Sequence, residues 1–336
     1  MTIRTISTEA PTPTPDRPAP GGATGALTWH RPLLVLTAAM VALAVASVVG
    51  LLVDERTLLG QPIWAKPLKF ALSIAIYAVT LAWLITLTRG RLRRVSWWAG
   101  TVSAVALVIE MVVIVGAVVA GTTSHFNVST PLASVLWSVM AVSIVVVWIA
   151  TLVVAFALFR APLRDPARSL AIRAGSILAL AGMALAFLMT SPTAAQLADF
   201  RGIAGAHSVG VADGGPGIPV LGWSTVAGDL RIPHFVGMHA LQALVLFVMA
   251  LEWAARRVAV LADVRVRFGL VAIATVLAAA TTAIVTVQAL MGESIVAPSA
   301  AIAGTTAVLW SGAAVAATLV VLRGIRHRGL SAAVDE

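Results

Sequence analysis

Long apolar runs alternate with short polar and charged segments over almost the whole chain. The runs cover residues 32–53, 67–88, 97–120, 132–159, 172–192, 234–255, 268–290 and 299–322. Each run reaches the roughly 20 residues that an α-helix needs to cross a hydrocarbon layer of about 30 Å. Because backbone polar groups in lipid must be paired within their own segment, the pattern predicts helices and not strands. We therefore expect an all-α, polytopic transmembrane bundle of about eight helices.

The polar ends of the chain set the limits of this bundle. Residues 1–30 are rich in Thr, Pro, Ala and Gly and have almost no large apolar residue, which predicts a disordered tail. The first apolar run has no small-residue cleavage site and is long enough to span, so we expect it to remain in the mature protein. The predicted organisation is a tail over 1–30, a membrane domain over 31–325 and a short tail over 326–336.

Lysine and arginine are distributed unevenly between the two sides of the predicted bundle. When alternate loops are assigned to opposite sides, 18 of the 23 basic residues fall on one side. By the positive-inside rule that side is cytoplasmic, which predicts both termini in the cytoplasm. The same rule accounts for the net charge of +9, so nucleic-acid binding is not expected.

Composition agrees with a membrane protein and excludes some chemistry. Sixty per cent of the 336 residues are apolar and only 11% are charged, against about 25% in soluble proteins. The chain has no cysteine, which excludes disulfides, Cys-ligated zinc, iron–sulfur clusters and a cysteine nucleophile. It also lacks the nucleophile elbow, the metalloprotease helix and the phosphate-binding glycine loop, which makes hydrolysis less attractive. The sequence leaves other enzymatic activity open.

The longest connection, residues 191–233, is predicted on the extracytoplasmic side. It contains a Gly- and Pro-rich stretch at 214–219, and its scattered apolar residues predict a loop packed on the bundle. Asp229 and Arg231 lie at its end, where an ion pair between them is expected to fix the entry of the chain into the sixth helix. Both residues are also candidates for a binding site.

Glu110 lies in the middle of the third apolar run, with about ten apolar positions on either side. A charge at that depth is costly, so an ionisable residue there suggests function. We expect Glu110 to bind a proton or to contact an ion or ligand. The alternative is a protonated side chain that hydrogen-bonds a neighbouring helix.

Four of the six histidines, His125, His207, His234 and His239, are predicted in the extracytoplasmic half. His30 and His327 lie among arginines at the other side and are expected to be solvated.

His234 and His239 are five residues apart and so point about 140° away from each other on a helix, which does not suit a two-ligand metal clip. His239 shares a helical face with Gln242, and its expected partner is His125. Two such histidines can ligate haem iron or a divalent metal. The alternative for each is a hydrogen-bonded interface histidine.

Lys66 and Lys69 begin the second helix on the same side, against the positive-inside tendency. They are expected either to snorkel to lipid phosphate or to face the acidic residues of the outer loops or an anionic ligand. Lys69 lies one turn deeper and is the stronger site candidate.

Three stretches together resemble a group of bacterial, notably actinobacterial, multi-pass membrane proteins that has no assigned activity. They are Lys-Pro-Leu-Lys-Phe-Ala-Leu-Ser at 66–73, Gly-Thr-Thr-Ser-His-Phe-Asn at 121–127 and Gly-Asp-Leu-Arg-Ile-Pro-His-Phe-Val-Gly-Met-His-Ala-Leu-Gln at 228–242. The resemblance implies a multi-pass bundle in a bacterial plasma membrane and brings no catalytic residue to this sequence. A separate echo, Val-Leu-Trp-Ser at 135–138 and again at 308–311, leaves open whether the two four-helix halves are a repeat.

These observations predict a polar, His-containing site in the extracytoplasmic half that binds haem, a metal ion or a small anionic ligand. One alternative is a proton-coupled secondary transporter that uses Glu110. Another is a sensor or assembly partner without chemistry of its own. The oligomeric state stays open. The predicted site is built from Lys69, Glu110, His125, Asp229, Arg231, His239 and Gln242, with His234 and His207 as further candidate ligands.

Overall fold

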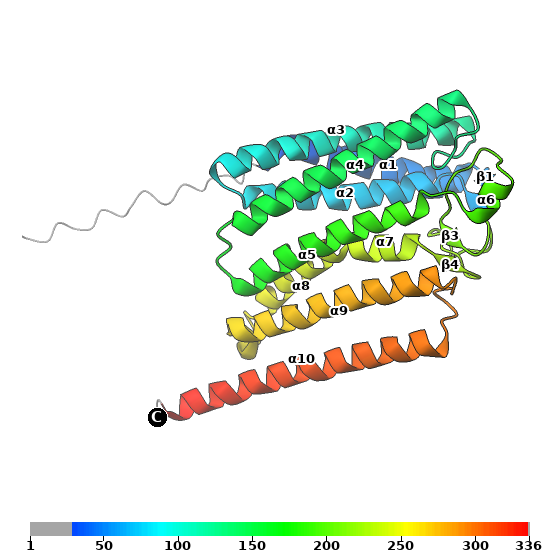
Figure 1. The fold of residues 1–336 in the computed structure, drawn as a ribbon. Coiled ribbons are helices and arrows are strands. Elements are labelled where there is room, and N and C mark those ends of the chain that lie inside the picture. The colour runs from blue at the N-terminus through cyan, green and yellow to red at the C-terminus, as the bar shows by residue number, and fades with distance from the viewer. Residues whose placement is uncertain (1–28, 335–336) are drawn as a thin grey trace, which may run out of the picture.

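Eight helical segments long and apolar enough to cross a membrane lie side by side in the computed structural model, which describes residues 29–334, with side chains to residue 328 (Figure 1). The spans are α1 (Arg31–Val53), α2 (Ala65–Thr86), α3 (Gly90–Ala120), α4 (Pro131–Arg160), α5 (Pro166–Ala184) with the 3-10 helix η1 (Leu185–Met189), α7 (Arg231–Met238) with α8 (Ala240–Ala254), α9 (Val264–Leu290) and α10 (Ala300–Val334). The shorter elements are β1 (Thr57–Leu58), β2 (Gln61–Pro62), α6 (Ala194–Ala198), β3 (Ser208–Val209), β4 (Gly228–Asp229) and the 3-10 helix η2 (Ala259–Ala262). The predicted all-α bundle is confirmed.

The helices extend beyond their apolar runs at one end of the bundle. Helix α3 begins at Gly90, seven residues before the predicted start at 97, and α10 continues to Val334, past the predicted end at 322. Arginine is a good helix former and can hold its charge in water while its stem lies on the helix, so a helix can continue where hydropathy falls. The expected short tail at 326–336 is therefore helical as far as 334, and the predicted tail at 1–30 lies outside the described residues up to residue 28.

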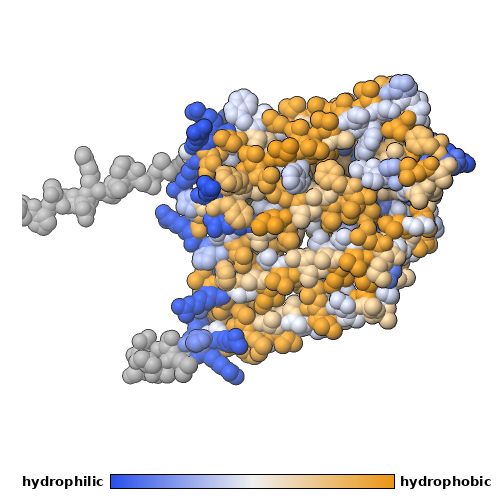
Figure 2. Space-filling model, in the orientation of Figure 1, coloured by the Kyte–Doolittle hydropathy of each residue, from blue (hydrophilic) through white to orange (hydrophobic). Residues whose placement is uncertain are grey.

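Both ends of the described chain lie at one end of the bundle, where α1 begins and α10 ends (Figure 1). Hydrophilic residues gather at that end and apolar residues cover most of the visible face between the two ends (Figure 2). We call it the arginine-rich end, because the α2–α3, α4–α5 and α8–α9 connections bring their arginines there. The opposite end carries β1 to β4 and α6 and is called the loop end.

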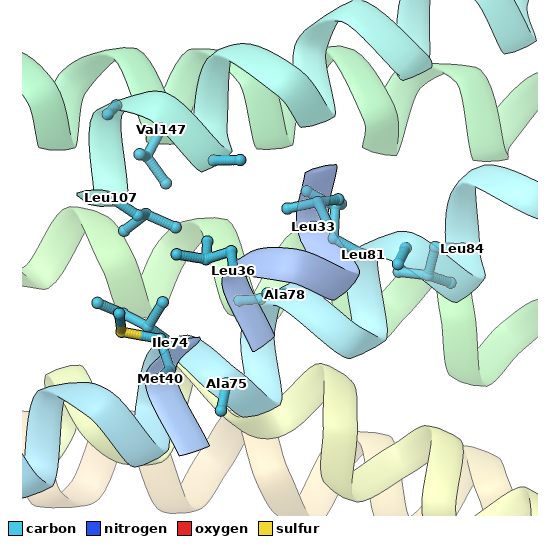
Figure 3. Close-up of a cluster of buried hydrophobic side chains, with 14 of the residues drawn as sticks. Leu33, Leu36, Met40, Ile74, Ala75, Ala78, Leu81, Leu84, Leu107 and Val147 are labelled. Carbon is cyan, nitrogen blue, oxygen red and sulfur yellow. The ribbon is translucent and has the colours of Figure 1, made fainter. Parts of the chain in front are cut away.

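The largest core cluster joins α1, α2, α3 and α4 with residues of α5 and α8, and Figure 3 labels members from the first four helices. Helix α2 lies inside this cluster and contributes four buried alanines spaced three or four residues apart, whose small side chains let a neighbouring helix approach closely. They are Ala71, Ala75, Ala78 and Ala82. A second cluster joins α5, α8 and α9, and α10 packs against α9 and η2 at the side of the bundle.

His30 is buried, contrary to the expectation that it is solvated; 1% of its surface is exposed. Its Nδ1 accepts a hydrogen bond from the Leu33 backbone and caps α1, while Nε2 lies 2.8 Å from the Trp97 carbonyl of α3. Burial lowers the pKa of His30 below its ordinary value, although the bond to Trp97 opposes the shift. The arginines near His30 in sequence did not reveal that its ring faces the core.

The sixth span is interrupted at His239, where a continuous helix was predicted. Helix α7 ends at Met238 and α8 begins at Ala240, with φ −92° and ψ 0° at His239. When the side-chain amide of Gln242 is oriented with its nitrogen toward the backbone, this nitrogen donates to the Met238 carbonyl at 3.2 Å and to the His239 carbonyl at 3.3 Å. Gln242 therefore pairs with backbone carbonyls at the interruption.

Candidate functional site

A polar stripe runs along α2 from the loop end into the bundle. Lys66, Lys69, Ser73 and Tyr77 follow one another at intervals of three or four residues, which places them on one helical face. That face lies opposite the four buried alanines, at about 100° per residue. Every member of the stripe contacts another element, and the deepest one, Tyr77, lies 2.8 Å from the Thr151 hydroxyl of α4.

Three ionisable side chains meet at the outer part of the stripe. Lys66 Nζ lies 3.1 Å from His125 Nδ1, and His125 Nε2 lies 3.8 Å from Glu110 Oε1. Glu110 is 1% exposed, and its other oxygen, Oε2, has no hydrogen-bond partner among the described residues. We call Lys66, Glu110 and His125 the ionisable cluster.

The chain after α3 turns back to complete this cluster. Glu110 is about ten residues before the end of α3, which is about 15 Å along a helix. Gly121 ends α3 with φ 67°, a left-handed conformation that glycine adopts without steric cost. The segment that follows carries Phe126 at φ 61°, and it brings His125 back within reach of Glu110.

Aromatic rings surround His125 and leave 16% of its side chain exposed. The ring centroids of Phe70, Trp137 and Phe126 lie 5.5, 5.5 and 6.0 Å from that of the imidazole. Burial, and then the charge of Lys66, lower the pKa of His125 well below its ordinary value. A neutral ring that accepts from Lys66 at Nδ1 carries its hydrogen on Nε2, directed at Glu110.

Lys69 and the outer loop make a second contact on the stripe. Lys69 Nζ donates to the Leu221 carbonyl at 2.7 Å, and neither Lys66 nor Lys69 is exposed. Both lysines point inward, so the alternative that they snorkel to lipid phosphate is not the arrangement found. Among the described residues neither lysine has a carboxylate within ion-pair distance.

Asp229 and Arg231 form the expected ion pair, at 2.5 Å. Asp229 also accepts from the Ser224 backbone, and Arg231 donates to the Gly222 carbonyl. Both oxygens of this fully buried carboxylate are therefore occupied within the loop. Asp229 therefore serves the structure of the loop and does not contact His239, because the loop backbone and Arg231 use its acceptors.

His207 likewise has its partner within the long connection. Its Nδ1 lies 2.7 Å from Asp213, which also accepts from the backbone of His207 and Ser208. Burial opposes ionisation of Asp213, but the hydrogen bonds from His207 outweigh it and hold the pKa of Asp213 below its ordinary value. Burial lowers the pKa of His207 despite its bond to Asp213. The pair closes a turn of the loop.

His234 and His239 face different helices. His234 Nδ1 donates to the Gly182 carbonyl of α5 at 2.8 Å, at a point where Gly182 and Gly237 let the two backbones touch. His239 Nε2 lies 3.1 Å from Ser73 Oγ on the polar stripe. The predicted pairing of His239 with His125 is thus corrected, because the ring of His125 is turned to Lys66 and Glu110.

The structure brings together Glu110 and His125 from the predicted set and leaves Asp229, Arg231, His207 and His234 in separate local contacts. Sequence reasoning undervalued Lys66 and missed Ser73 and Tyr77. The spacing of four polar residues on one face of α2 was the signal that could have identified the stripe. Over residues 29–334, no group of three or more His, Asp or Glu side chains is arranged to hold a metal ion.

Comparison with protein-family models, curated proteins and solved structures finds no match to this chain. The length and hydropathy of the eight long helices within residues 29–334 make it a multi-pass membrane protein.

Proposed function

We propose that this membrane protein is a proton-coupled transporter in which Glu110 takes up and releases the proton. The carboxyl group of Glu110 carries the proposal: it is 1% exposed, one oxygen faces His125 at 3.8 Å and the other has no partner among the described residues. A carboxylate in that setting costs several kcal/mol, and a bound proton removes most of that cost. The buried carboxylate of Asp229, in contrast, has both oxygens occupied.

The neighbours of Glu110 supply a route for the proton. His125 has one ring nitrogen toward Glu110 and the other toward Lys66. A neutral imidazole can accept a proton at one nitrogen and release the hydrogen on the other, so it can relay protons without leaving its place. Ser73 and Tyr77 continue the polar stripe deeper into the bundle, where Ser73 contacts His239 and Tyr77 contacts Thr151.

The two lysines indicate the kind of solute. Lys66 and Lys69 point inward without an ion-paired carboxylate among the described residues. Unpaired buried charges are costly, so a site with two such cations favours an anionic ligand. The proposed solute is a small anion that takes the place of the Leu221 carbonyl on Lys69.

Anion binding without transport is the second candidate function. The contact between Lys69 and the Leu221 carbonyl favours it. An anion that binds Lys69 would displace this carbonyl, and the resulting movement of the outer loop would signal that the site is occupied. Haem or metal binding has less support. Each of the four histidines at this end has a ring nitrogen in contact with a protein group, and the four rings do not converge on one point. They are His125, His207, His234 and His239.

The test uses purified protein in liposomes that contain a trapped pH-sensitive dye. Chloride, acetate and phosphate are added outside in turn, and internal pH is followed. We expect at least one anion to drive a pH change that Glu110→Gln reduces at least tenfold. Glutamine keeps a hydrogen-bonding group at that depth, whereas lysine would add about 2.5–3.5 kcal/mol to insertion. Glu55→Gln is the matched control, because Glu55 is exposed.

The outcomes separate the two candidates. A pH change that is equal in Glu110→Gln and in the parent removes Glu110 from the proton path. If none of the anions moves protons but one raises the unfolding temperature of the parent and not of Lys69→Met, the protein binds an anion without transporting it. Equal behaviour of Lys69→Met and the parent in both assays would remove the anion site.

A further inference from the structure

A cavity of about 540 Å³ opens at the arginine-rich end, far from the polar stripe along the helices. Its walls come from the end of α2, the α2–α3 and α4–α5 connections, α5, α8 and α9. Four arginines and two acidic residues line it, which leaves a charge of +2 (four minus two). The charged lining consists of Arg89, Arg164, Arg168 and Arg267 with Asp165 and Glu252.

Two of the arginines are held in place by the two acidic residues. Arg168 binds Glu252 through two nitrogens, at 3.0 and 2.5 Å, and Arg267 binds Asp165 at 2.9 Å. Because these pairs neutralise both carboxylates, they fix the walls without cancelling the remaining charge. Arg267 also has a buried Nε without a hydrogen-bond partner among the described residues.

The other two arginines carry the uncompensated charge. Arg89 directly precedes α3, and Arg164 lies in the α4–α5 connection. Both are exposed, and neither has an ion pair with any carboxylate of the described residues. Sequence-distant segments thus place two guanidinium groups without an ion-paired carboxylate at one cavity whose other two arginines are ion-paired.

From this arrangement we infer a binding site for a phosphate-bearing anion at the arginine-rich end, with Arg89 and Arg164 as its principal contacts. Guanidinium groups match the geometry of phosphate oxygens and bind them through paired hydrogen bonds. The charge of +2 matches a phosphate monoester or two phosphodiesters. The same chemistry is offered by the headgroup of an anionic phospholipid and by a soluble phosphate compound, and basic pockets between transmembrane helices are suited to the former.

The positive-inside rule alone does not explain this convergence. That rule requires arginine at this end but does not require the side chains to share a cavity. Arg94 and Arg256 satisfy the rule, are exposed and do not line the cavity. They provide a matched control, because replacing them removes the same charge from the same end.

The experiment compares the parent with Arg89→Gln/Arg164→Gln and with Arg94→Gln/Arg256→Gln, each as purified full-length protein. In the soluble arm, inorganic phosphate or pyrophosphate is titrated at constant ionic strength, and unfolding is followed by tryptophan fluorescence. In the lipid arm, retention of phosphatidylglycerol is compared with retention of phosphatidylcholine by native mass spectrometry. We expect a Kd at least tenfold weaker in Arg89→Gln/Arg164→Gln, about 1.4 kcal/mol, and no change in Arg94→Gln/Arg256→Gln.

Each outcome decides the proposal. Selective loss of phosphatidylglycerol supports a lipid headgroup, and selective loss of phosphate or pyrophosphate binding supports a soluble ligand. Equal losses in the two double variants, or binding of neither probe by the parent, would overturn it. Should the Arg89→Gln/Arg164→Gln protein not assemble, the single variants replace it with the same expectation for each. Proton movement through Glu110 is measured separately, so failure here leaves the proposed function untouched.

Discussion

Gly182→Ala is expected to destabilise the protein by forcing α5 and α7 apart. A Cβ at this position would lie 2.1 Å from the Met238 backbone nitrogen and 2.2 Å from the Gly237 carbonyl carbon. Ordinary contact begins near 3.4 Å, so the backbones must separate by 3.4 minus 2.1, or 1.3 Å. Both obstructing atoms belong to the main chain, which cannot rotate out of the way. The same movement stretches the bond from His234 to the Gly182 carbonyl, now 2.8 Å.

The magnitude follows from three opposing contributions. Overpacking of a close contact costs about 1–3 kcal/mol, and weakening a buried hydrogen bond costs about 0.5–1.5 kcal/mol. Alanine recovers about 1 kcal/mol through its higher helix propensity. The net loss of unfolding free energy should be about 0.5–3.5 kcal/mol, and Gly182→Val should lose more because its side chain is larger and the recovery smaller.

Gly116→Ala in α3 provides the control, because no heavy atom lies within 4 Å of its added Cβ. We expect it to be neutral or to stabilise by up to about 1 kcal/mol. Unfolding of the purified variants is followed by tryptophan fluorescence against denaturant. If Gly182→Ala and Gly116→Ala have equal stability, the backbone contact between α5 and α7 is not as close as described, and the position of His234 loses its explanation.

Three further predictions concern topology, loop stability and pH. Reporter fusions after Arg164 should read cytoplasmic and those at Asp213 extracytoplasmic; the reverse at Asp213 would overturn the orientation. Asp229→Ala should cost about 3–5 kcal/mol, because it leaves Arg231 partly buried without its carboxylate, and faster trypsin cleavage of the loop would report the loss. The folded pKa of His30 lies below 6.5, so the unfolded chain takes up the proton first and stability should fall as pH drops below about 6.5. His30→Asn, which keeps a capping side chain, should flatten that fall in thermal unfolding curves, and an unchanged slope would count against a neutral His30.

Hydropathy determined the number and nature of the helices, because length and apolar content are properties of each segment by itself. The helix ends were predicted less accurately. Arginine permits a helix to continue into water, so α3 and α10 are longer than their apolar runs. The ion pair of Asp229 and Arg231 was also predictable, since two residues close together in a constrained loop need no distant partner.

Contacts between distant segments were decided only by the tertiary structure. His125 was expected beside His239, yet the turn after α3 directs it to Glu110 and Lys66, and no local pattern specifies that direction. His30 was expected in water, but the packing of α1 against α3 buries its ring and gives it the Trp97 carbonyl as a partner. The sequence alone therefore determined which residues are unusual in a membrane, because the cost of a buried charge depends on depth. Which of them meet depended on how eight helices of similar apolar character pack, and that is set by small residues and turns spread over the whole chain.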